Sequence, residues 1–184
     1  MIKTPTAKKP GRVERILAAA QNLILRNGLR GTTMEEIARE AGVAKPTLYK
    51  YFPEKAVLYE TLVERFITEI RVSFDAALSQ AEPVEKRIGD ALTAKKKYVF
   101  RLLHASPHSR ELYDDDPDMP MGAVREFERY SEDEITRVLE ESGHQGARYL
   151  AQLLIACSGG IAKRAQFAEQ IGPAIRLVTE KLLA

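Results

Sequence analysis

The chain of 184 residues contains a single cysteine, Cys157, and no long uninterrupted run of apolar residues. One cysteine cannot form an intramolecular disulfide, which excludes a disulfide-stapled fold and agrees with a reducing compartment. No stretch approaches the roughly 18 apolar residues that a membrane span needs. No apolar signal core follows the basic residues at the N-terminus. We therefore expect a cytoplasmic protein.

The sequence also lacks the motifs that carry catalysis or bind metals. Histidine and cysteine are rare and scattered, at His104, His108, His144 and Cys157. Their spacings fit neither a metal site nor a nucleophile, and no glycine-rich phosphate loop is present. Residues 114–120 carry aspartates at alternate positions, but Met119 and Arg125 stand where a calcium loop needs Gly and Glu. We therefore predict a protein that is not an enzyme and has neither a cofactor nor a metal.

Charge is distributed unevenly in a chain of otherwise ordinary composition. Hydrophobic residues make up 45% and charged residues 29%, as in globular proteins, and the length suits one core plus a small additional domain. Residues 1–55 carry 11 Lys or Arg against 5 Asp or Glu, whereas the remainder carries 17 against 21. A basic N-terminal region indicates a polyanion-binding end. A solvated basic surface is the alternative that charge alone leaves open.

Apolar residues recur at helical spacing along the chain, and no stretch predicts a strand, so the fold class is all-α. Thr33 and Glu36 form a T-x-x-E capping box that begins a short helix, which ends at the A-G-V of residues 41–43. The next helix begins within one or two residues, because Leu48 and Phe52 lie four apart. The other helices are expected near 12–27, 54–80, 83–106, 122–142, 145–168 and 173–183, with a further short one at 107–113.

Two short helices joined by a tight turn form a helix-turn-helix pattern. Gly42 in the turn permits a positive backbone dihedral. The second helix lies in "AKPTLYKYF", residues 44–52, whose lysines, threonine and tyrosines suit a buried helix poorly. In this motif the second helix enters the DNA major groove and presents its N-terminal residues to base edges. The pattern therefore favours a DNA-reading surface over a packing surface.

Residues 32–62, TTMEEIAREAGVAKPTLYKYFPEKAVLYETL, closely resemble the DNA-binding segment of tetracycline-repressor (TetR) family regulators. The shared pattern is T-x-x-x-I-A, then A-G-V, then T-L-Y-x-Y-F, then Lys55 opening a long helix. The resemblance implies a three-helix DNA-binding head at residues 1–55 and a helical ligand-binding and dimerisation body at residues 56–184. Ala44 and Glu54 depart from the family pattern, which has better N-capping residues at both positions.

Carried over by position, the resemblance implies a set of DNA-binding residues. The DNA-facing surface comprises Lys45, Pro46, Thr47, Tyr49, Lys50 and Tyr51, and the phosphate contacts are Thr33 and Lys55. The side-chain chemistry agrees, because lysines and hydroxyls donate to phosphate or guanine oxygens and proline can contact a thymine methyl. A phosphate would also offset the unfavourable position of a lysine at a helix start. Leu48 and Phe52 are expected to face the core of the head.

The resemblance further implies that the body binds a small molecule and dimerises. Gly159 and Gly160 in the penultimate helix, together with Ile175, Val178 and Leu182 in the last, predict a four-helix interface between two chains. Packing of these faces within one subunit is the alternative. The candidate ligand contacts are Tyr98, Leu102, Phe127, Tyr130, Leu154 and Cys157. For each of these a plain core position is the alternative.

The sequence thus predicts a sequence-specific transcriptional regulator that binds an inverted-repeat operator of double-stranded DNA as a homodimer. The resemblance favours a repressor that a small apolar or aromatic ligand releases from the operator. A DNA-binding dimer without a small-molecule effector is the alternative.

Overall fold

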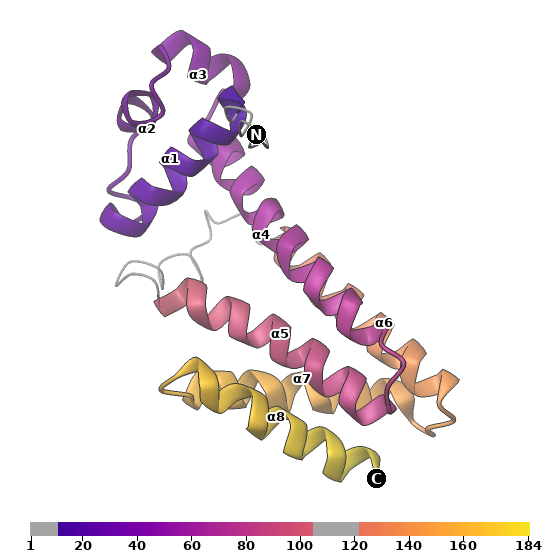
Figure 1. Cartoon of the computed structure of the whole chain (residues 1–184). Coiled ribbons are helices and arrows are strands. Elements are labelled where there is room, and N and C mark those ends of the chain that lie inside the picture. Colours follow the sequence, from indigo (N-terminus) through magenta and orange to yellow (C-terminus); the bar gives the residue numbers. More distant parts are fainter. Residues whose placement is uncertain (1–10, 105–121) are drawn as a thin grey trace, which may run out of the picture. The chain divides into compact units, whose positions relative to one another are not determined.

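The computed structural model describes residues 11–104 and 122–184, and within these ranges it contains eight α-helices and no strand (Figure 1). The helices are α1 (Arg12–Asn27), α2 (Met34–Glu40), α3 (Lys45–Tyr51), α4 (Lys55–Leu78), α5 (Val84–His104), α6 (Gly122–Glu141), α7 (Ala147–Arg164) and α8 (Ala168–Leu183). The predicted all-α fold is confirmed. The helix expected at 107–113 and the acidic segment at 114–120 lie outside the described residues. No helix in the described ranges is long and apolar enough to cross a membrane.

The chain divides into two compact units, which we call the head and the body. Among the described residues the head comprises 11–62, and the body comprises 63–104 and 122–184. Helix α4 begins in the head and continues into the body, so the contact boundary falls inside a helix, at Leu62–Val63. The division at residues 55 and 56 that the sequence suggests stays a prediction.

Each helix of the head contributes a buried aliphatic side chain to one core. Ile16 of α1, Ile37 of α2, Leu48 of α3 and Leu58 of α4 are all among the fully buried residues. Burial of such a side chain contributes about 1.5–3 kcal/mol relative to its exposure. Phe52, directly after α3, is also buried, as the four-residue spacing from Leu48 predicts.

Local signals fix both ends of α2. At its start the Thr33 hydroxyl accepts a hydrogen bond from the Glu36 amide (3.3 Å), and the Glu36 carboxylate accepts one from the Thr33 amide (2.9 Å). At its end the Val43 amide donates to the Ala38 carbonyl (3.0 Å), and Gly42 has a φ of 63°. This is the Schellman arrangement, in which glycine adopts the left-handed conformation at low cost. The turn therefore sets the direction in which α3 begins.

Helix α5 packs against α8 in the body, and α6 packs against α7. Glycines allow α5 and α8 to approach closely: a Cβ on Gly89 would lie 2.8 Å from the Thr179 hydroxyl, and one on Gly172 would lie 3.2 Å from the Thr93 methyl. Ile88 and Leu92 of α5 are fully buried in the core that these helices enclose.

The start of α8 differs from the sequence-based expectation. Pro173, expected as the first residue of the last helix, lies inside α8, which begins at Ala168, and α7 ends at Arg164 instead of near 168. The Gln170 side-chain oxygen accepts hydrogen bonds from the amides of Gln166 (2.8 Å) and Phe167 (3.3 Å), which satisfies donors at the helix start. A proline is common in a first turn, but here Gln170 supplies the start signal instead.

Candidate nucleic-acid interface and effector site

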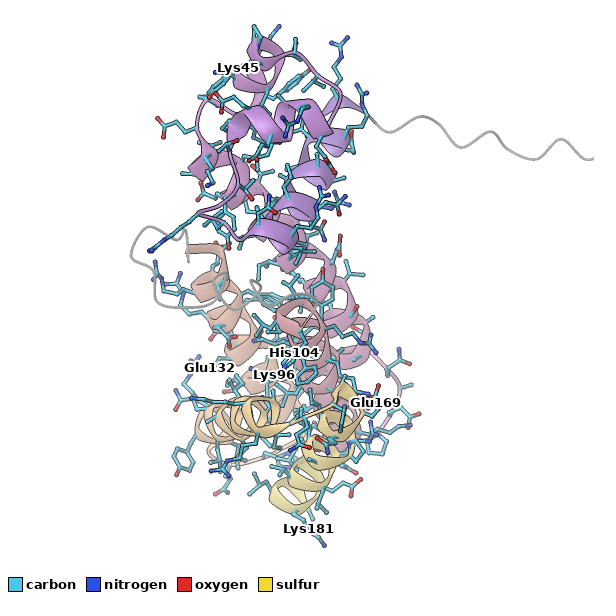
Figure 2. All side chains as sticks on the ribbon, turned by 90° about the vertical axis from the view of Figure 1, so that its left-hand side faces the viewer. Lys45, Lys96, His104, Glu132, Glu169 and Lys181 are labelled. Atoms are coloured by element: carbon cyan, nitrogen blue, oxygen red, sulfur yellow. The ribbon has the colours of Figure 1, made fainter. Side chains whose placement is uncertain are left out.

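Helix α3 presents one polar and aromatic face to solvent and buries the other. Tyr49 is 37% exposed and Tyr51 41%, whereas Leu48, directly before Tyr49, is 0% exposed. Lys45, Pro46 and Lys50 are also exposed, and Thr47 is half-buried. Figure 2 shows Lys45 at the surface of the head. Two exposed tyrosines on a short helix leave apolar ring surface in water. Together with the neighbouring lysines they form a surface suited to stacking and hydrogen bonding with a partner.

Lys45, the first residue of α3, has two partners within the head. Its ammonium forms an ion pair with the Glu35 carboxylate of α2 and lies 5.8 Å from the centre of the Tyr49 ring. The hydrogen bond from Lys45, followed by a backbone hydrogen bond, lowers the pKa of Glu35, and the bond to Glu35 raises the pKa of Lys45. Both groups are therefore charged at neutral pH, and the lysine side chain has a defined direction on the α3 surface.

Both residues that are predicted to contact phosphate form hydrogen bonds within the head. The Thr33 hydroxyl donates to the Glu36 carboxylate (2.8 Å) while it caps α2. The Lys55 ammonium donates to the Leu29 carbonyl, which links the start of α4 to the turn after α1. Burial lowers the pKa of Lys55, and the charge of Glu36 partly opposes this effect. Lysine has three N–H donors, so one contact to a carbonyl leaves donors for a phosphate. The phosphate roles of Thr33 and Lys55 stay predictions.

The start of α3 has a weak cap, as the sequence indicates. Ala44 occupies the N-cap position with no side-chain hydrogen bond to the helix. The amides of Thr47 (2.8 Å) and Leu48 (3.1 Å) donate to the Ala44 carbonyl, and Pro46 has no amide hydrogen that would need a partner. The proline thus reduces the number of free donors that a cap would otherwise satisfy.

The six candidate ligand residues divide into buried and half-buried positions in the body. Phe127 and Leu154 are buried in the core, and Tyr98, Leu102, Tyr130 and Cys157 are half-buried. The Phe127 ring lies edge-on to the Phe74 ring, with the ring centres 5.9 Å apart. It also stacks on the Tyr130 ring, with the ring centres 6.2 Å apart. The structure therefore joins two of the candidates, Phe127 and Tyr130, in one aromatic cluster with Phe74.

Both candidate tyrosines bind carboxylates of α4. The Tyr98 hydroxyl donates to Glu69 (2.7 Å), and the Tyr130 hydroxyl donates to Asp75 (2.9 Å). The Arg71 guanidinium lies 3.8 Å from the centre of the Tyr130 ring. Burial is the largest cause of a raised pKa at both hydroxyls, and the carboxylates add to it. The tyrosines therefore stay neutral donors that tie α5 and α6 to α4.

A buried lysine is the feature of the body that sequence reasoning missed. The Lys95 side chain is 3% exposed, and its ammonium donates to Glu128 (2.9 Å) and Ser131 (3.0 Å) of α6. The ammonium also lies 4.7 Å from the centre of the Phe127 ring. Burial lowers the pKa of Lys95 to about 8, although Glu128 opposes the effect. A signal existed, because Lys95 follows Ile88 and Leu92 at the helical spacing of the buried face.

The residues predicted for the subunit interface do not all face outward. Ile175 is buried in the core of its own body, and Val178 packs against that core. Gly160 is exposed, and nothing described lies within 4 Å of the position of a Cβ there. Tyr149 of α7 is 71% exposed and Leu177 of α8 is 57% exposed. Both helices thus carry apolar surface outside the subunit core.

Comparison with known proteins adds independent findings. Residues 16–62 match the family model of bacterial regulatory proteins, tetR family. The chain is 37% identical over 54 residues to the HTH-type transcriptional regulator EthR of Mycobacterium tuberculosis, which covers 29% of this chain and 25% of that protein. It is 29% identical over 101 residues to the HTH-type transcriptional activator FasR of Mycolicibacterium smegmatis, covering 55% and 45%. The matches therefore span less than half the length of these curated relatives.

A solved structure extends the likeness in fold to nearly the whole chain. A TetR-family transcriptional regulator from Mesorhizobium loti matches with a TM-score of 0.73 over 94% of this chain and 95% of that one, at 18% identity. At this identity the match concerns the fold, whereas the family model and the sequence relatives concern the sequence itself. Residues 16–62, which contain the helix-turn-helix, are therefore a DNA-binding domain of the TetR family, and the matches together support a TetR-family transcriptional regulator.

Proposed function

We propose that the protein binds a specific operator in double-stranded DNA through the exposed face of α3. The observation that carries the proposal is the division of this helix, with Tyr49, Lys50 and Tyr51 exposed and Leu48 and the following Phe52 buried. A recognition helix needs this division, because its inner face must pack while its outer face contacts bases and phosphates. We also propose the cytoplasm as the compartment, since DNA is the partner.

The operator is an inverted repeat bound by a homodimer. A helix as short as α3 reaches few base pairs, and a two-fold dimer reads two symmetric half-sites. The exposed Tyr149 and Leu177, together with the open position at Gly160, support an interface on α7 and α8. A second helix can approach closely where glycine leaves the surface open.

The regulator is a repressor that a small apolar or aromatic ligand releases from DNA. The family resemblance supports repression, although the similar protein FasR is named an activator. The aromatic cluster of Phe74, Phe127 and Tyr130 supports the ligand class. Such a ligand releases DNA only if it binds the DNA-free conformation more tightly than the DNA-bound one. Burial of Phe127 and Leu154 in the core favours the second candidate, a DNA-binding dimer without an effector.

Selection of bound duplexes from a random DNA library tests the operator proposal. Sequencing of the bound pool should recover an inverted repeat, and light scattering of the purified complex should show two or four chains on one duplex. Enrichment of no sequence at all, or full affinity with one chain on the duplex, would contradict the proposal.

Two measurements in series test the effector. Thermal-shift screening of metabolites identifies binders, which are then titrated into the preformed complex with the selected duplex. Apolar or aromatic binders should dissociate the complex. Binders that are all strongly charged and sugar-like would contradict the ligand class, and a screen without any binder would favour the second candidate.

A further inference from the structure

A carboxylate lies on the surface that the proposed function directs toward a polyanion. Glu35 is the second residue of α2 and forms an ion pair with Lys45, the first residue of α3. The side chains are 55% and 56% exposed respectively. An exposed ion pair contributes little to stability, because water and salt screen it. The helix dipole favours a carboxylate in the first turn of α2, but this effect does not require a partner on the DNA-binding helix. Stability therefore does not explain why Glu35 pairs with the lysine of that helix.

The other carboxylates of α2 have separate structural partners. Glu36 accepts from the Thr33 amide and completes the capping box. Glu40 accepts from the Arg26 guanidinium of α1 (2.8 Å). Glu35 is thus the α2 carboxylate that pairs with α3, and its partner is a residue of the proposed DNA surface. Lys45 is further restrained by the Tyr49 ring, 5.8 Å from its ammonium.

We propose that Glu35 is a positioning residue that makes the contact between Lys45 and DNA selective, an inference that rests on the proposed function. On non-operator DNA, Lys45 must leave Glu35 to neutralise a phosphate, and the freed carboxylate then repels the backbone. On the operator, Lys45 retains its ion pair with Glu35 and donates its remaining N–H groups to a guanine acceptor. The carboxylate therefore weakens non-operator binding more than operator binding, which raises specificity by disfavouring the wrong partner.

Glu35→Gln tests this inference, with Glu40→Gln as the matched control. Each variant removes one exposed carboxylate of α2 that pairs with a cation, but Arg26 lies on α1 instead of α3. Affinities are measured by fluorescence anisotropy at several salt concentrations, on the selected operator and on a scrambled duplex. Glu35→Gln should tighten scrambled-duplex binding about threefold to tenfold and steepen its salt dependence by about one ion per site, because Lys45 then neutralises a phosphate without leaving an unpaired carboxylate beside the DNA backbone. Operator affinity should change about twofold or less.

The inference also requires that Glu35 acts through Lys45. In a Lys45→Ala background, Glu35→Gln should no longer lower the ratio of operator to scrambled-duplex affinity, as a double-mutant cycle would show. Glu40→Gln should leave that ratio unchanged in either background. An equal loss of specificity in both glutamine variants, an undiminished effect of Glu35→Gln without Lys45, or an unchanged ratio would overturn the inference while operator binding still stood. Failure of the unsubstituted protein to prefer any duplex would overturn the proposed function instead.

Discussion

Replacement of Lys95 by methionine should stabilise the protein at neutral pH. The Lys95 side chain is 3% exposed, and the lowered pKa of its ammonium reflects the free energy cost of burying the charge. Methionine has a similar length, carries no charge and packs well in irregular apolar space. Neither Ser131 nor Glu128 becomes a buried polar group without a partner in the variant. Ser131 still donates to the Phe127 carbonyl (2.7 Å), and the Glu128 side chain is 43% exposed and can be hydrated.

The magnitude follows from the pKa of Lys95, which falls from 10.5 to about 8 on folding. This difference corresponds to about 3 kcal/mol against the charged form in the folded state. Below pH 8 the lysine is charged in both states, so the whole cost is present. Between about pH 8 and 10.5 the unfolded chain binds more protons than the folded one, so stability rises with pH. The methionine variant should gain about 1–3 kcal/mol at pH 7, since replacing a buried ion pair by apolar groups is often stabilising.

Urea unfolding at pH 7, 8, 9 and 9.5 measures both effects. These values stay below the range in which Tyr98, whose pKa is raised by burial, would lower stability by ionising in the unfolded chain. The native protein should gain stability between pH 8 and 9.5 relative to Lys95→Met. Lys97→Met, at a half-buried position of the same helix, is the matched control and should keep the native pH dependence. Parallel pH profiles for the native protein and Lys95→Met, or a variant destabilised at pH 7, would refute the reasoning.

Further substitutions test the head and the subunit interface. Gly42→Ala should cost about 1–2 kcal/mol in thermal unfolding, because alanine resists the φ of 63°; an unchanged melting temperature would contradict this. Lys55→Ala should weaken binding to all duplexes about equally, reduce the salt dependence by about one charge per site, and lower stability as Leu29 loses its donor. Altered base preference in Lys55→Ala with an unchanged salt dependence would contradict its assignment as a phosphate contact. Tyr49→Phe should cost about 1 kcal/mol of DNA affinity with stability unchanged. Gly160→Ala should stabilise an isolated helix by about 0.5–1 kcal/mol yet weaken dimerisation in sedimentation; an unaffected dimer would exclude this position from the interface.

Local and periodic features of the fold could be predicted from the sequence. The capping box at Thr33 and Glu36 needs only a three-residue spacing, and the structure contains both of its hydrogen bonds. Burial of Leu48 and Phe52 follows from helical spacing together with the polar residues between them. The helix-turn-helix was predictable for the same reason, because its turn and its caps are encoded within a few residues.

Contacts between residues distant in sequence could not be predicted in this way. Lys95 reaches Glu128 on another helix, and no local pattern specifies the partner of a lysine. The phosphate contact of Lys55, which the family resemblance implies, stays a prediction, whereas its bond to the Leu29 carbonyl joins residues 26 positions apart and could not be predicted. Pro173 was interpreted as a helix start because proline suits a first turn, but Gln170 provides the start of α8. The contacts of Lys95 and Lys55 depend on tertiary geometry that the residue type does not specify. The start of α8 is set by a local contact between residues three and four positions apart, which competes with the signal from the proline.

One triple variant tests most directly whether the exposed face of α3 is the DNA-reading surface. Lys45, Tyr49 and Lys50 are all replaced by alanine, and affinity for the selected operator is measured beside the circular dichroism of the free protein. These side chains are exposed, so helix content and unfolding should change little. Operator affinity should fall at least about 100-fold, as expected for the loss of several phosphate and base contacts. A fully folded variant that binds the operator as tightly as the native protein would contradict the account.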